Sequence, residues 1–212
     1  ADMAIALEQL KSMACAAAMA VQADVSNEAQ VLTMFDKVTA KLGQITGLVN
    51  NAGVVDMTAR LDEMSVARWK RMFDINVIGS IVCTREAVRR MSTRYGGEGG
   101  SIVNVSSAAA RIGAPGQYVD YAAAKSAIDA FTIGLAKEVA AEGIRVNAVR
   151  PGLIDTDIHA SGGLPNRVRD LAHLVPMQRG GTSEEVAQAI VWLLSDAASY
   201  TTMSLMEISG GR

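Results

Sequence analysis

Two side chains with complementary proton chemistry, Tyr121 and Lys125, lie in an Ala-rich segment whose spacing predicts a helix. Positions four apart share one helix face, with about 6 Å of axial rise between them. A free tyrosine titrates at about pH 10 and is a poor proton carrier at neutral pH, but a nearby cation lowers its pKa. The pair therefore predicts a tyrosine that exchanges a proton with a bound substrate.

Two serines precede this helix, at the end of a predicted strand. The β-branched run 101–105 follows a Gly-rich break, so Ser106 and Ser107 fall at the carboxyl end of a strand, where open α/β sheets place their ligand sites. A serine hydroxyl there can hydrogen-bond the oxygen of a carbonyl or alcohol that the tyrosine protonates or deprotonates. Together these residues are the parts of a carbonyl–alcohol redox site.

The elements that must position this site alternate between helices and strands. Helices are expected at 2–12, 27–42, 65–94, 121–142 and 182–195, and strands at 18–23, 45–49, 101–105, 144–149 and 204–208. This alternation predicts an α/β fold with a Rossmann-like, doubly wound parallel sheet, right-handed crossovers and three α/β/α layers. At 212 residues, the chain fits a single domain with a sizeable core.

Three motifs occur in an order and spacing that resemble the short-chain dehydrogenase/reductase family. They are Asn50-Asn51-Ala52-Gly53, the block from Ser107 to Tyr121-x-x-x-Lys125, and Asn147-Ala148-Val149-Arg150-Pro151-Gly152-Leu153-Ile154-Asp155-Thr156. Tyr-x-x-x-Lys alone arises often by chance, whereas three motifs in register over nearly the whole chain are specific.

The resemblance implies an NAD(P)-dependent oxidoreductase that moves a hydride between nicotinamide and a secondary alcohol or ketone. Tyr121 would be the general acid/base, and Lys125 would lower its pKa and hold the nicotinamide ribose. Ser107 would orient the carbonyl oxygen, and Asn76, in the middle of a predicted helix, would hold a relay water rather than face solvent. The Ser107–Tyr121 interval is one residue longer than the commonest spacing in the family, which keeps Ser106 open as an alternative.

Tyr118 is a rival to Tyr121, because it also precedes Lys125 on roughly the same helix face. Seven residues correspond to about 10.5 Å of axial rise, which is too far for direct contact with the lysine. We therefore interpret Tyr118 as a substrate-side or packing residue.

The cofactor contacts implied by the resemblance follow the strand ends. Asp24 would contact the adenine, the Asn-Asn-Ala-Gly turn would line the cofactor cleft, and the Pro-Gly turn with the segment after it would pass along the nicotinamide. The full set is Asp24, Val25, Asn51, Ala52, Gly53, Tyr121, Lys125, Pro151, Gly152, Ile154 and Thr156. The choice between NAD and NADP stays open, as does the substrate, whose recognition we assign to the polar connection 157–181, typical of a lid.

The sequence also departs from the family. The first strand, Gly-rich turn and first helix have no counterpart in it, and that turn supplies backbone donors to the cofactor phosphates. As written, the chain is expected to bind a dinucleotide poorly. Either this segment was left out of the sequence or the chain is truncated, and we favour the first. Met203 stands where the family usually has Gly, and Ser209 where it often has Asp.

Composition excludes several other classes. A net charge of −2 and a pI near 5.7 argue against a nucleic-acid partner, and no apolar run reaches the ~18 residues of a membrane span. The Ala-rich start lacks a basic leader, so a cytoplasmic protein is expected. Cys15 and Cys83 are interpreted as reduced thiols, and no metal site is predicted around His159 and His173.

Two functions remain compatible with the sequence. The first is the oxidoreductase, and the alternative is a non-catalytic member of the same family that acts as a scaffold or regulatory subunit without binding dinucleotide. Helices 65–94 and 118–142 carry more apolar residues than one sheet face needs. In the family these helices pair across a dimer axis, so a homodimer or homotetramer is expected.

Overall fold

A parallel four-stranded sheet forms the centre of the computed structural model, which describes residues 17–212. Its strands, in spatial order, are β1 (Gly47–Asn50), β2 (Gly100–Val105), β3 (Ile144–Pro151) and β6 (Leu205–Ile208). Val49 lies opposite Val103, and Ala148 lies opposite Leu205. All carboxyl ends therefore meet at one edge of the sheet.

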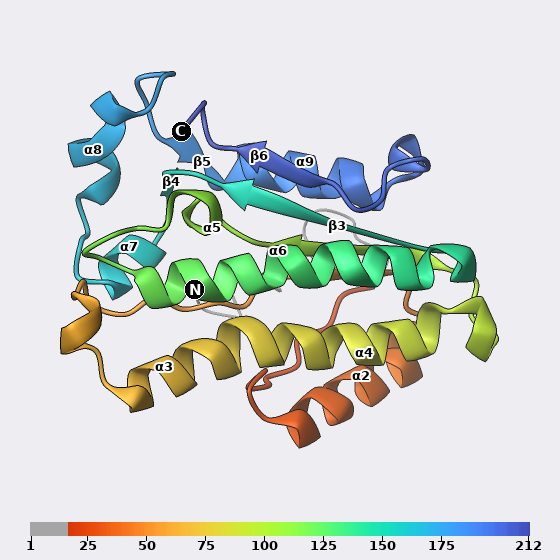
Figure 1. The fold of residues 1–212 in the computed structure, drawn as a ribbon. Coiled ribbons are helices and arrows are strands. Elements are labelled where there is room, and N and C mark those ends of the chain that lie inside the picture. Colours follow the sequence, from red (N-terminus) through yellow and green to blue (C-terminus); the bar gives the residue numbers. More distant parts are fainter. Residues whose placement is uncertain (1–16) are drawn as a thin grey trace.

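Helices cover both faces of this sheet (Figure 1). The longer ones are α2 (Glu28–Leu42), α3 (Val66–Phe73), α4 (Ser80–Met91), α6 (Val119–Val139) and α9 (Ser183–Leu194). α4 and α6 pack on one face, with α2 beside α4, and α9 packs on the other. The prediction of a Rossmann-like, doubly wound α/β fold is confirmed.

The core has two parts because successive strand residues point to opposite faces. Ile102 and Val146 pack with α2, α4 and α6, whereas Val103 and Val149 pack with α9. These four side chains are fully buried. Near-continuous apolar strands such as β2 are typical of parallel sheets covered on both sides.

The predicted strand 18–23 is wrong. Residues 17–24 form no strand, and within the described part of the chain β1 pairs with β2 alone. A strand needs a hydrogen-bonding neighbour, which a local apolar pattern cannot provide. The predicted helix 2–12 and Cys15 lie outside the described residues.

The predicted helix 65–94 is interrupted. A π-helical turn, Asp74–Gly79, joins α3 to α4, and α4 ends at Met91 because Ser92 adopts an extended conformation. The polar connection 157–181 contains the short helices α7 (Ile158–Ser161) and α8 (Arg167–Leu171). The strands β4 (Ile154–Asp155) and β5 (Gly181–Thr182) flank it and pair with each other.

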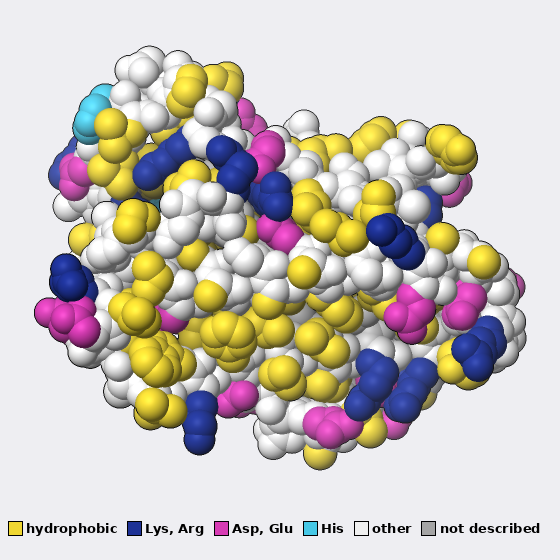
Figure 2. Space-filling model, in the orientation of Figure 1, with side chains coloured by type: hydrophobic (Ala, Val, Ile, Leu, Met, Phe, Trp, Pro, Cys, Tyr) yellow, Lys and Arg dark blue, Asp and Glu magenta, His cyan; other side chains and the backbone are white. Residues whose placement is uncertain are grey.

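Hydrophobic side chains gather on the face formed by α4 and α6 (Figure 2). Val66 and Phe73 in α3, and Ile78 in the π-helical turn, are exposed to solvent. No helix among residues 17–212 is both long and apolar enough to cross a membrane.

Met203 adopts the left-handed conformation that favours glycine, with φ 66°. This conformation costs residues with a Cβ about 1–2 kcal/mol. We expect Met203→Gly to raise the free energy of unfolding by about 1 kcal/mol, after the greater freedom of glycine in the unfolded chain is subtracted. Thermal denaturation would show a Tm higher by about 2–4 °C. Met203→Ala keeps the Cβ and is the control; an equal gain from Ala would contradict the explanation.

Candidate active site

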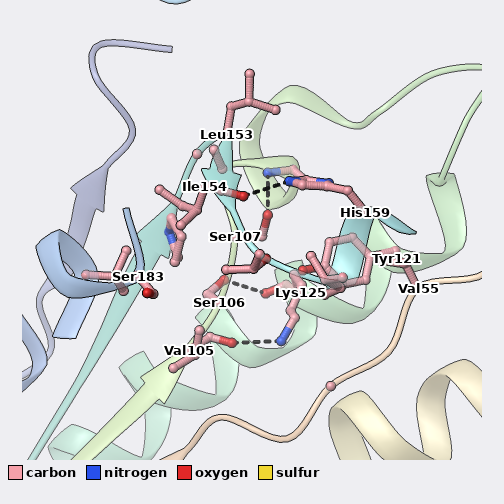
Figure 3. Close-up of a pocket in the computed structure, with 18 of the residues that line it drawn as sticks. Val55, Val105, Ser106, Ser107, Tyr121, Lys125, Leu153, Ile154, His159 and Ser183 are labelled. Atoms are coloured by element: carbon pink, nitrogen blue, oxygen red, sulfur yellow. Dashed lines mark hydrogen bonds between the residues drawn. The ribbon is translucent and has the colours of Figure 1, made fainter. Parts of the chain in front are cut away.

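A cavity of about 990 Å³ opens at the carboxyl ends of β1, β2 and β3. Ser107, Tyr121 and Lys125 line it, as do segments that follow each of the three strands. Figure 3 shows these side chains near one another, with His159 close by and directed toward the Ile154 carbonyl. The fold thus brings together residues that come from three separate sequence motifs.

The two serines at the end of β2 have different environments. Ser106 is buried, and its hydroxyl donates to the Lys125 carbonyl at 3.2 Å, which ties β2 to α6. Ser107 is half-buried; its Oγ accepts from the Ala109 N–H at 3.1 Å, and its side chain also interacts with the Tyr121 phenol. This geometry favours Ser107 as the residue that contacts a bound substrate.

Tyr121 lies in the first turn of α6, with its ring at the cavity wall. Burial raises the pKa of its phenol, and the interaction with the Ser107 side chain acts in the opposite direction. Burial has this effect because it disfavours the charged phenolate. Tyr121 therefore holds its proton at neutral pH in this structure.

Lys125 is almost fully buried, one turn further along α6. Its Nζ donates to the Val105 carbonyl at 2.7 Å and lies 5.7 Å from the centroid of the Tyr121 ring. Burial lowers the pKa of Lys125 to about 8, while the negative charge of Asp129 raises it. Burial of the phenol sets the direction of the Tyr121 pKa in this structure. That Lys125 lowers this pKa stays a prediction.

Asn76 lies in the π-helical turn and is fully buried, which excludes a solvent-facing role. Its side chain accepts from the Val54 N–H and donates to the Val54 carbonyl, both at 3.0 Å. It is not among the cavity-lining residues. However, a Cβ added to Gly53 would lie 2.8 Å from Asn76 Oδ1 and 3.5 Å from Lys125 Nζ, so both groups approach the same glycine. Asn76 thus fixes the chain that follows the Asn-Asn-Ala-Gly turn.

The predicted cofactor residues divide into two groups. Those that line the cavity, besides Tyr121 and Lys125, are Asn51, Gly53, Pro151, Gly152, Ile154 and Thr156. Gly152 has no room for a side chain, because a Cβ there would lie 2.7 Å from Ser209 Cα. The close approach of β3 to the chain after β6 therefore requires glycine at this position.

Asp24, Val25 and Ala52 do not line the cavity. Asp24 is exposed and accepts hydrogen bonds from the Ser26 hydroxyl and N–H, which lower the pKa of its carboxyl. Val25 packs against Gly79. In this structure these two residues form the turn that leads into α2.

Sequence reasoning did not single out two arginines that line the cavity. Arg167 and Arg212 line the cavity together with His159, whose Nε2 lies 2.9 Å from the Ile154 carbonyl. Tyr118 also lines it, is buried, and donates to the Gly162 carbonyl at 3.4 Å. An arginine in a polar connection gives no local signal, since only the folded chain reveals what faces it.

The parallel sheet covered by helices, with a cavity at its carboxyl edge, is a Rossmann-type arrangement. Residues 2–212 match the family described as enoyl-(acyl carrier protein) reductase, and the chain belongs to the short-chain dehydrogenase/reductase family. Members of this family are NAD(P)-dependent oxidoreductases.

Several relatives match over most of this chain. It is 54% identical over 195 residues to the oxidoreductase YgfF of Escherichia coli, covering 92% of this chain and 79% of the relative. It is 41% identical over 197 residues to cis-4-hydroxycyclohexanecarboxylate dehydrogenase of Sinomonas cyclohexanicum, covering 92% and 76%. It is 40% identical over 189 residues to 3-oxoacyl-[acyl-carrier-protein] reductase FabG of Thermotoga maritima, covering 89% and 74%.

The residues around the cavity fit the nicotinamide end of such a cofactor. Lys125 and Tyr121 offer polar hydrogens for ribose hydroxyls, and Asn51 and Thr156 line the same cavity. Pro151, Gly152 and Ile154 line the cavity beside them.

Proposed function

We propose that the protein interconverts a secondary alcohol and a ketone with NAD or NADP, using Tyr121 as the general acid/base. The observation that supports this most is the convergence of Ser107, Tyr121 and Lys125 on one cavity wall at the strand ends. Bound nicotinamide would supply the hydride acceptor or donor.

The chain's own residues perform the proton chemistry. Ser107 donates its hydroxyl proton to the substrate oxygen and orients that oxygen toward the Tyr121 phenol. In reduction the phenol gives its proton to that oxygen, and in oxidation the phenolate removes the proton of the alcohol. The Lys125 ammonium stabilises the phenolate and donates to the cofactor ribose, while Asn76 holds the chain beside Gly53 in place for a relay water.

We include an assembly in the proposal, namely a cytoplasmic homodimer or homotetramer. It is supported by the apolar side chains gathered along α4 and α6 (Figure 2). An exposed apolar surface of this kind usually marks an interface.

The experiment that tests the function is Lys125→Met in a dinucleotide-dependent assay of alcohol oxidation. Loss of the ammonium removes the cation that favours the phenolate, so the Tyr121 pKa rises. The pH at which oxidation appears should therefore move upward by about one to two units. Dinucleotide binding should weaken as well, because a ribose donor is lost. The measurement is kcat against pH, followed by nicotinamide absorbance, with calorimetry for binding.

Lys137→Met, at an exposed position near the end of α6, is the matched control and should keep both the pH profile and the affinity. A pH profile of Lys125→Met that coincides with wild type would refute the electrostatic role. Absence of any dinucleotide-dependent turnover in the wild-type protein, over a broad panel of alcohols and ketones, would favour the scaffold alternative.

A further inference from the structure

Arg167 is a half-buried cation on the substrate side of the cavity. It begins α8, and its guanidinium lies 5.4 Å from the centroid of the Tyr118 ring. Its Nη2 donates to the Gln117 side-chain oxygen at 2.7 Å. Both partners belong to the segment just before Tyr121, so Arg167 is held against the wall that carries the candidate acid/base.

This guanidinium has no carboxylate partner within residues 17–212, although most other arginines there form ion pairs with Asp or Glu. Burial lowers the pKa of Arg167, the Tyr118 phenol raises it, and the charge of Arg212 on the same cavity lowers it again. Among the described lining side chains, Asp157 alone is acidic, and it is exposed. A partly desolvated cation beside a second cation is best compensated by an anion.

We propose that Arg167 anchors a carboxylate on the substrate, so that the enzyme acts on oxo acids and hydroxy acids. This inference rests on the proposed function and names the substrate class for the same cavity. A planar guanidinium pairs with a carboxylate through two parallel hydrogen bonds, and its contacts with Gln117 and Tyr118 fix its orientation for that pairing.

The position of Arg167 also sets the distance between the two ends of the substrate. Its guanidinium lies 5.4 Å from the centroid of the Tyr118 ring, and Tyr118 precedes α6, whereas Tyr121 lies in the first turn of that helix. The carboxylate is therefore held at a different residue from the reacting oxygen. This favours acids with several carbons between the two groups over 2-oxo acids, in which the carboxyl carbon adjoins the ketone carbon.

The test compares matched acids and esters in reduction with NADH or NADPH. 5-Oxohexanoate should have a kcat/KM about 10–100 times that of its methyl ester, as expected for a charged hydrogen-bonded pair. Pyruvate should show no such advantage over methyl pyruvate. In Arg167→Gln the advantage of 5-oxohexanoate over its ester should disappear, chiefly through a higher KM for the acid. Arg169→Gln, on the same helix but exposed and paired with Asp170, should retain it.

Calorimetry without turnover separates this inference from the proposed function. In the presence of oxidised dinucleotide, 5-oxohexanoate should bind wild type about 10–100 times more tightly than it binds Arg167→Gln. The same result without any ketone reduction would uphold the carboxylate site while rejecting the proposed reaction. Equal kcat/KM of wild type for acid and ester, or an unchanged acid-to-ester ratio in Arg167→Gln, would overturn the carboxylate proposal. So would a loss of dinucleotide affinity in Arg167→Gln with the acid preference intact, which would assign the guanidinium to a cofactor phosphate.

Discussion

Tyr121→Phe is expected to lower kcat by about 10²–10⁴-fold, which is the range that a positioned general acid/base contributes. The phenol oxygen is the proton carrier in the proposed reaction, whereas the ring that remains still fills its place beside Lys125. The fold should therefore persist. Steady-state kinetics of nicotinamide absorbance give the activity, and urea denaturation gives the free energy of unfolding.

Tyr118→Phe is the matched comparison, because Tyr118 lines the same cavity and loses only a long hydrogen bond to the Gly162 carbonyl. We expect its kcat to fall by less than about 10-fold, since the group it loses takes no part in proton transfer. If Tyr121→Phe kept most of the wild-type turnover, or if Tyr118→Phe lost more turnover than Tyr121→Phe, Tyr121 would not be the general acid/base.

Asp120→Ala is expected to lower the free energy of unfolding by about 3–5 kcal/mol. Asp120 forms a two-point ion pair with Arg68, with Nε–Oδ2 at 2.7 Å and Nη2–Oδ1 at 3.2 Å. The exposed fractions of the two side chains are 11% for Arg68 and 2% for Asp120. Removing the carboxylate leaves a buried guanidinium without its charged partner, and urea denaturation would measure the loss.

A double variant, Asp120→Ala with Arg68→Met, distinguishes loss of the pair from the cost of an isolated charge. It should be more stable than Asp120→Ala alone, because the unpaired cation is gone. The exposed pair Arg60–Asp62 provides the control, and Asp62→Ala should change stability little. A small effect of Asp120→Ala would contradict the view that this pair fastens α3 to the first turn of α6.

The parts of the site that the sequence predicted are those whose geometry is local. Tyr121 and Lys125 share a helix face because of their spacing alone, and Ser107 follows a strand that its own β-branched residues favour. The strand ends meet at one edge because the sheet is parallel, so three separate motifs converge on one cavity.

The parts that the sequence did not predict depend on distant neighbours. The segment 18–23 has a strand-like composition, yet pairing is decided by the chain that lies beside it. Arg167 is held at the cavity by contact with Gln117 and Tyr118, which are distant from it in sequence. The high pKa of Tyr121 depends on how deeply α6 is packed, which spacing along one helix does not reveal.

The π-helical turn Asp74–Gly79 joins α3 and α4 into one continuous helix, whose two parts contact different neighbours. Each additional residue rotates the rest of the helix by about 100° around its axis, and a π turn holds one residue more than an α turn. α3 therefore directs Arg68 to the start of α6, while α4 keeps Cys83, Ala87 and Met91 in phase with the sheet core. Substitutions that change the contact of α3 with α6 therefore need not turn the core residues of α4 toward water. Deleting a single residue within the turn would remove this offset and force one of the two parts out of register.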